Sequence, residues 1–168
     1  MRHHCHATPR TLLFVLLLVG FTSLATAQEP DGKIDEHFLL LMGARNATKA
    51  GMPHVAVKRY RALLTRNPHL HEIQQELGWV LMATGQLADA EQQFRLVLDA
   101  HPDNTQAWTG LLETLRKTNK HDEILTTLTR LVGLEPLRKD MRMQLALELH
   151  NRGKFVDAER HIAVLLGE

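Results

Sequence analysis

The chain has 168 residues, of which 44% are hydrophobic and 23% charged, a composition typical of a folded protein rather than a disordered one. Twenty basic and 19 acidic residues leave a formal charge of +1, which excludes a global field that attracts nucleic acid or lipid headgroups. The single cysteine, Cys5, excludes an internal disulfide framework and a zinc site built from several cysteines.

The first 27 residues are typical of a cleavable secretory signal peptide. A leader with two arginines and no acid precedes the apolar run Leu12–Val19, and small residues surround a cleavage site after Ala27. A membrane span needs about 20 apolar residues, and Gly20 interrupts this one. We therefore expect a periplasmic or secreted mature chain with a short linker at residues 28–36. An uncleaved anchor at Leu12–Val19 is the alternative.

The remainder of the chain repeats with a period of 34 residues. Periods of this size indicate stacked supersecondary units. Three columns recur at that interval. Prolines lie at Pro68, Pro102 and Pro136, and turn residues at Gly51, Gly85, Asn119 and Gly153. Small residues lie at Ala56, Ala90 and Ala158, and Ile124 departs from that column in the third unit.

Each column has a physical reason that predicts a pair of helices in every unit. Glycine or asparagine is favoured where a helix ends in a left-handed turn. Proline disfavours helix in the residue before it, so the second helix of each unit should close just ahead of the proline column. The apolar spacing between these marks is helical, and no segment alternates like a strand. The predicted units are 37–70, 71–104, 105–138 and 139–168.

The stretch 77–104 resembles the tetratricopeptide repeat. The matching residues are Leu77, Gly78, Gly85, Leu87-Ala88-Asp89-Ala90-Glu91, Phe94, Val97, Leu98 and Pro102-Asp103-Asn104. The resemblance implies an all-α fold: a right-handed superhelical array of about four helix-turn-helix repeats after the signal peptide, with a concave groove. It says little about chemistry, because these positions serve packing.

In this family the first helix of each pair lines the groove, and the resemblance therefore implies which residues face a partner. They are Leu41, Arg45, Lys49, Gln75, Trp79, Met82, Thr109, Glu113, Arg116, Lys117, Met143, Leu147 and His150. Trp79 lies outside the packing columns, so it either anchors a bound segment or packs against a neighbouring inner helix. Trp108 occupies a packing column and is expected in the core.

The first two units carry opposite charge. Residues 37–70 hold six basic side chains and no acid, whereas residues 71–104 hold six acids and Arg95. Two interpretations stay open: ion pairs across the joint between these units, or a bipolar face that orients a partner.

No catalytic, phosphate-binding or metalloprotease motif occurs, and His69 with His71 supply too few ligands for a metal site. We expect no catalytic residue, no metal and no cofactor. The leading hypothesis is a non-enzymatic scaffold of the bacterial envelope. It would bind a peptide or helix of another envelope protein during pilus, secretion, polysaccharide-export or cytochrome assembly, without nucleic acid or a small-molecule substrate. A membrane-tethered structural subunit is the second hypothesis.

The last predicted helix, Phe155 to Leu166, has apolar residues on more than one face and no polar helix after it within the sequence. We expect this helix to leave an apolar face bare. A partner or the same helix of a second copy, related by two-fold symmetry, would cover it and give a homodimer.

Overall fold

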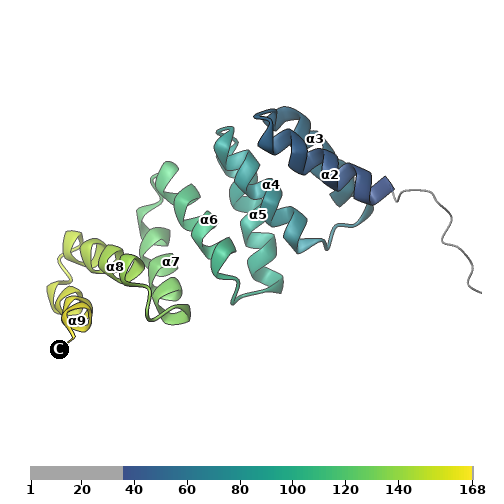
Figure 1. Cartoon of the computed structure of the whole chain (residues 1–168). Coiled ribbons are helices and arrows are strands. Elements are labelled where there is room, and N and C mark those ends of the chain that lie inside the picture. The colour runs from purple at the N-terminus through teal and green to yellow at the C-terminus, as the bar shows by residue number, and fades with distance from the viewer. Residues whose placement is uncertain (1–35, 168) are drawn as a thin grey trace, which may run out of the picture. The chain divides into compact units, whose positions relative to one another are not determined.

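The structure is a computed structural model that describes residues 36–167, and within this range it contains eight α-helices and no strand. The helices follow one another along the array (Figure 1). Their bounds are α2 (Glu36–Lys49), α3 (Pro53–Arg66), α4 (His71–Ala83), α5 (Leu87–Ala100), α6 (Thr105–Lys117), α7 (His121–Leu134), α8 (Lys139–Asn151) and α9 (Phe155–Leu166). The all-α prediction is confirmed. The expected signal peptide lies outside the described residues.

Helices pair across short turns, and each pair then packs against the next one. Within residues 36–167, each helix packs mainly on the helices before and after it in sequence, and α4 also packs on α6. α2 begins at Glu36, the last residue of the expected linker, where an acid suits the N-terminal end of the helix dipole. The Glu36 carboxylate also accepts a hydrogen bond from Arg66 Nη2 at 2.8 Å.

The predicted left-handed turns are present between the two helices of all four pairs. Gly51, Gly85 and Gly153 have φ of +68°, +79° and +72°, and Asn119 takes the same position with φ of +55°. The backbone reverses within three residues at each of these turns. Residues other than glycine and asparagine rarely adopt the positive φ that the turn requires.

The proline column closes α3, α5 and α7, each of which ends two residues before its proline, Pro68, Pro102 or Pro136. The carbonyl of each proline accepts a hydrogen bond from the side chain six residues later. The donors are Gln74 Nε2, Trp108 Nε1 and Arg142 Nη2, at 2.9, 2.9 and 2.8 Å. Three chemically different residues thus perform one task at one position of the repeat, and Trp108 lies partly buried against the core as predicted.

The tightest packing surrounds Phe94, which is fully buried between three helices. A Cβ added to Gly78 of α4 would lie 2.9 Å from the Phe94 ring, and one added to Gly110 of α6 would lie closer still. Phe94 of α5 therefore fills the space of two missing side chains. Ala44 and Ala90, at small-residue positions of their helices, are also fully buried.

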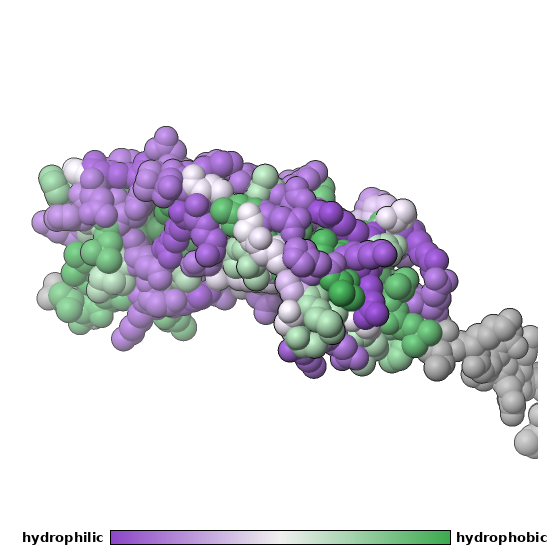
Figure 2. Space-filling view, turned by 90° about the horizontal axis from the view of Figure 1, so that it is seen from above, coloured by the Kyte–Doolittle hydropathy of each residue, from purple (hydrophilic) through white to green (hydrophobic). Residues whose placement is uncertain are grey.

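The final helix, α9, leaves much of its apolar surface exposed, as the sequence predicts. Ala158 is its only buried residue within the described part of the chain. Figure 2 shows hydrophobic surface at this end of the array and again around its first helices. The exposed large side chains of α9 are Phe155, Val156, Ile162, Val164 and Leu166.

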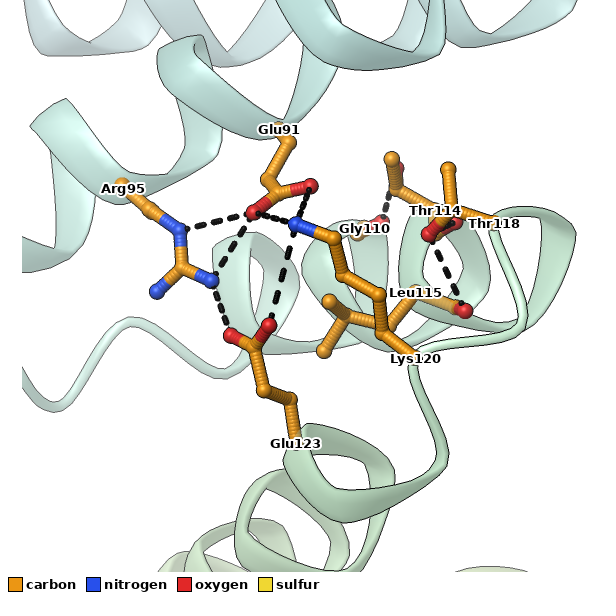
Figure 3. Close-up of polar contacts among 8 residues, drawn as sticks. All are labelled: Glu91, Arg95, Gly110, Thr114, Leu115, Thr118, Lys120 and Glu123. Carbon is orange, nitrogen blue, oxygen red and sulfur yellow. Dashed lines mark hydrogen bonds and ion pairs between the residues drawn. The ribbon is translucent and has the colours of Figure 1, made fainter.

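A charged cluster joins α5 to α7 (Figure 3). Glu91 accepts hydrogen bonds from Arg95 Nη2 and Lys120 Nζ, both at 2.9 Å, and Arg95 continues to Glu123. Burial alone would raise the pKa of Glu91, but the hydrogen bonds from Lys120 and Arg95 outweigh it and hold that pKa below its usual value. The contribution of Glu91 to this joint therefore requires its ionised form, while Arg95 and Lys120 also pair with Glu123.

Candidate partner-binding face

The first helices of the four pairs, α2, α4, α6 and α8, form a surface that we call the A-helix face. Side chains join these helices in sequence. Arg45 binds Glu72 and Glu76 from α2 to α4, at 2.9 Å for Glu72. Gln75 links α4 to α6 by a hydrogen bond to Gln106 at 2.8 Å. Arg116 links α6 to α8 by a hydrogen bond to Gln144 at 2.6 Å. The face is thus continuous and is held in place by hydrogen bonds.

Trp79 lies near the middle of the A-helix face, on α4. One edge of its ring packs on Phe94 of α5, with 5.3 Å between centroids and an interplanar angle of 72°. This contact is with the second helix of its own pair, and packing of Trp79 against a neighbouring first helix stays a prediction. The ring remains partly exposed, so Phe94 fixes an aromatic surface that is still open to solvent.

Two surface hollows meet at Trp79. The first measures about 320 Å³ and is lined mainly by apolar parts of Arg45, Thr48, Lys49, Tyr60, Glu76, Trp79 and Val80. The second measures about 490 Å³ and is lined by Trp79, Thr105, Gln106, Thr109, Glu135 and Arg138. A side chain bound in either hollow would contact the indole ring.

The wall of the first hollow is a hydrogen-bonded group of three side chains. The Tyr60 hydroxyl donates to Glu76 Oε2 at 2.8 Å, and Arg45 Nε donates to Glu76 Oε1 at 3.0 Å. Burial, followed by the bond to Glu76, raises the pKa of Tyr60 to about 12. The hydrogen bonds that Arg45 donates to Glu76 raise the pKa of Arg45 further above its already high value. Tyr60 is therefore uncharged and Arg45 charged near neutral pH, and both are hydrogen-bonded to Glu76, so the wall is fixed.

Part of the opposite charge of the first two units is used in ion pairs across their joint. Arg45 binds Glu72 and Glu76, and Arg61 Nη2 binds Asp89 Oδ2 at 2.6 Å. These contacts favour the ion-pair interpretation over a bipolar face. Lys49 and Lys58 make no ion pair with any residue in the described range.

The other residues predicted for the groove are placed in three ways. Leu41 and Met82 are partly buried and pack against the core. Glu113 and Arg116 form an ion pair at 3.3 Å, and His150 stacks edge-on with Phe155 of α9 at 5.1 Å. The rest, at the C-terminal half of the face, are exposed: Lys117, Met143 and Leu147.

Several residues of this site are absent from the sequence-based prediction. Glu72, Glu76 and Tyr60 form the wall beside Arg45, and Glu135 with Arg138 line the second hollow. A partial signal for Glu72 and Glu76 exists in the sequence, because they are acids in the first half of the first helix of the unit that follows Arg45. No such signal exists for Glu135 and Arg138, which lie in the connection between units.

The histidines at the first joint pair with neighbours. His71 Nδ1 lies 3.0 Å from Gln74 Oε1, and its ring stacks edge-on with His101 at 4.8 Å between centroids. Across residues 36–167, no three His, Asp or Glu side chains are grouped as a metal site requires. None of the helices in that range is both long and apolar enough to cross a membrane.

Comparison with known proteins agrees with this architecture. Residues 47–115 match the family described as tetratricopeptide repeat. Over 84 residues the chain is 36% identical to DnaJ homolog subfamily C member 3 of Rattus norvegicus and, to the same extent, of Homo sapiens. Those matches cover 50% of this chain and 17% of each relative, so the chain spans about a sixth of their length.

Solved structures of MamA are similar in fold. The structure of MamA from residue 41 to its end, from Desulfovibrio magneticus RS-1, superposes with a TM-score of 0.68 at 14% identity, covering 96% of both chains. Another MamA crystal structure gives a TM-score of 0.67 at 17% identity and covers 78% of this chain and 73% of that one. The family match over residues 47–115, the 34-residue period and the paired helices show that the chain contains tetratricopeptide repeats.

Proposed function

We propose that this protein is a non-enzymatic scaffold that binds a segment of a partner protein on its A-helix face. The observation that carries the proposal is Trp79, a partly exposed indole that Phe94 orients between two hollows. Buried aromatic anchors supply much of the binding energy in protein interfaces, and tryptophan is enriched among them.

The surroundings of Trp79 favour a preformed site. Arg45, Glu76 and Tyr60 are bonded to one another, and Gln75 is bonded to Gln106. Binding therefore orders few additional side chains, which lowers the entropic cost of association.

The chemistry of the first hollow indicates the kind of segment that fits. Its floor is largely apolar, and the charge of Arg45 is compensated by Glu72 and Glu76. We expect a bulky apolar side chain against Trp79. Lys49, without an ion pair inside the described residues, is available for an acidic group beside it.

The proposed location is the bacterial envelope, because of the predicted signal peptide at residues 1–27. The partner would be another envelope protein, bound while a larger complex is assembled. N-terminal sequencing of the exported protein tests this location. A chain that starts at Gln28 supports it, whereas a retained Met1 supports the second hypothesis, a subunit tethered by Leu12–Val19.

Photo-crosslinking tests partner binding. A benzophenone amino acid replaces Thr109 on the A-helix face or Thr126 on the exposed side of α7. The two sites are matched, because both threonines donate a hydrogen bond to the carbonyl four residues earlier. We expect the probe at Thr109 to capture a defined segment of one partner and Trp79→Ala to abolish that capture. Equal capture from Thr126 would contradict the proposed site.

A further inference from the structure

Both ends of the described array expose residues that are buried at the corresponding positions of other units. Leu39 of α2 is 53% exposed, whereas its equivalents Ile73, Ala107 and Met141 are 4%, 0% and 4% exposed. Each unit has its own second helix, so the difference arises from the preceding unit, which α2 lacks among residues 36–167. α2 therefore presents one half of a joint.

α9 presents the other half. Ile162 is 40% exposed, while its equivalents Tyr60, Phe94 and Leu128 are 2%, 0% and 1% exposed. Leu166 is 70% exposed, against 8% and 6% for its equivalents Leu98 and Val132, and the third equivalent, Leu64, is half-buried. At internal joints the following unit covers these positions, and no following unit covers them on α9 in the described range.

The chemistry of the two halves is matched. At the first internal joint, Arg45 of one unit binds Glu72 and Glu76 of the next. The position equivalent to Arg45 in the last unit is Leu147, and the positions equivalent to the two acids in the first unit are Phe38 and Met42. All three are large, apolar and exposed. Charge has thus been replaced by apolar surface on both sides of the same contact.

A second contact shows the same replacement. Arg61 binds Asp89 at one joint and Arg95 binds Glu123 at the next, through equivalent positions 34 residues apart. In α9 the residue equivalent to these arginines is Ala163. In α3 the residue equivalent to the acids is Val55, which is exposed.

A third contact is also matched in this way. Tyr60 bonds to Glu76 across the first joint, and Phe94 meets Gly110 across the second. The corresponding residues at the two ends are Ile162 and Met42, both apolar and both 40% exposed.

We infer that a second copy of this chain covers each end: α8 and α9 of one copy pack on α2 and α3 of the next, as successive units pack inside the array. The two surfaces differ, so the contact is heterologous and can continue from copy to copy. An apolar interface suits this contact, because complementary burial of the two faces stabilises it without the ion pairs of the internal joints.

Two single substitutions on the purified chain test the inference. Leu39→Glu blocks the α2 end, and Leu166→Lys blocks the α9 end. Both side chains are more than half exposed, and each new charge suits its end of the helix dipole. Sedimentation equilibrium should show wild-type mass rising beyond a dimer with concentration. Each variant alone should associate about thirtyfold more weakly, as expected for a central interface residue.

The mixture of the two variants is decisive. One copy retains an intact α9 end and the other an intact α2 end, so an equimolar mixture should form dimers with wild-type affinity and nothing larger. Circular dichroism confirms that both variants fold. A wild-type protein that stays monomeric at all concentrations, or a mixture that does not associate, would overturn the inference.

A matched control separates this contact from a two-fold pairing of α9 helices. Val156 is 64% exposed, but its equivalents His54, Ala88 and Asp122 are exposed in every unit, so it is not a joint position. Val156→Lys should leave association unchanged. Loss of association in Val156→Lys, together with normal dimers in Leu39→Glu, would indicate the two-fold arrangement instead.

A charge restoration gives a positive test. Leu147→Arg with Met42→Glu in one chain recreates at the ends the contact that Arg45 makes with Glu76. Each single variant should associate more weakly than wild type, and the double variant should recover association that weakens with added salt. No recovery in the double variant would contradict the proposed register.

Discussion

Gly110→Ala is the substitution that tests the packing of the array most sharply. In a helix interior, alanine is favoured over glycine by about 1 kcal/mol. Here the added methyl would lie well under 3.0 Å from the Phe94 ring, and a Cβ at Gly78 would lie 2.9 Å from the same ring, so the ring is confined at both glycines. Overpacking of this kind costs about 1–3 kcal/mol. Less the helix-propensity gain, this leaves a net loss, and we expect the free energy of unfolding to fall by up to about 2 kcal/mol.

Urea unfolding followed by circular dichroism measures this change, and two further variants identify its cause. Gly133→Ala is the control, because no atom lies within 4 Å of its added Cβ, and it should stabilise the protein by about 0.5–1 kcal/mol. Phe94→Leu makes room for the methyl, so Gly110→Ala should destabilise that background less than it destabilises wild type. An equal loss in both backgrounds would refute the argument that Phe94 fills the space at Gly110.

The remaining predictions concern stability and are also measured by urea unfolding. Ala90→Asp should cost more than 3 kcal/mol, because it buries an unpaired carboxylate, whereas Asp89→Ala removes only an exposed pair with Arg61 and should cost less than about 1 kcal/mol. Similar losses would mean that the register of α5 is wrong. Gly85→Ala should cost about 1–2 kcal/mol because of its φ of +79°, and an unchanged stability would contradict the strained turn. The pKa of Glu91 is lower in the folded protein than its ordinary value of 4.5. Glu91 therefore contributes fully to folding stability above pH 4.5, and this contribution is lost as the pH falls through the folded-state pKa. Glu91→Gln should therefore lose less stability than wild type between pH 6 and 3. If the free energies of unfolding of the two proteins fall in parallel with pH, Glu91 does not have this role.

Much of the fold follows from the sequence because its determinants are local. Gly51, Gly85, Asn119 and Gly153 occupy left-handed turns, and the proline column marks the helix ends. A backbone requirement restricts a position to one or two residue types, and the repetition of that restriction makes it visible.

The hydrogen bonds that hold the units together are not visible in this way. The donors to the proline carbonyls are glutamine, tryptophan and arginine, which share an N–H group but no other property. The site at Trp79 can likewise be predicted from the sequence only in part. Its position on the first helix can be predicted from the register, but its orientation depends on Phe94, and the hollow beside it depends on Tyr60 and Glu76.

The central claim, that a partner segment binds against Trp79, is tested most directly by tryptophan fluorescence. The chain has two tryptophans, so Trp108→Phe leaves Trp79 as the only indole and Trp79→Phe leaves Trp108. The partner segment captured from Thr109, prepared as a peptide, is titrated into both variants. We predict a saturable blue shift of Trp79 emission in the first variant, because binding removes the exposed ring from water, and no shift of Trp108 in the second. Binding that leaves Trp79 emission unchanged would contradict the account.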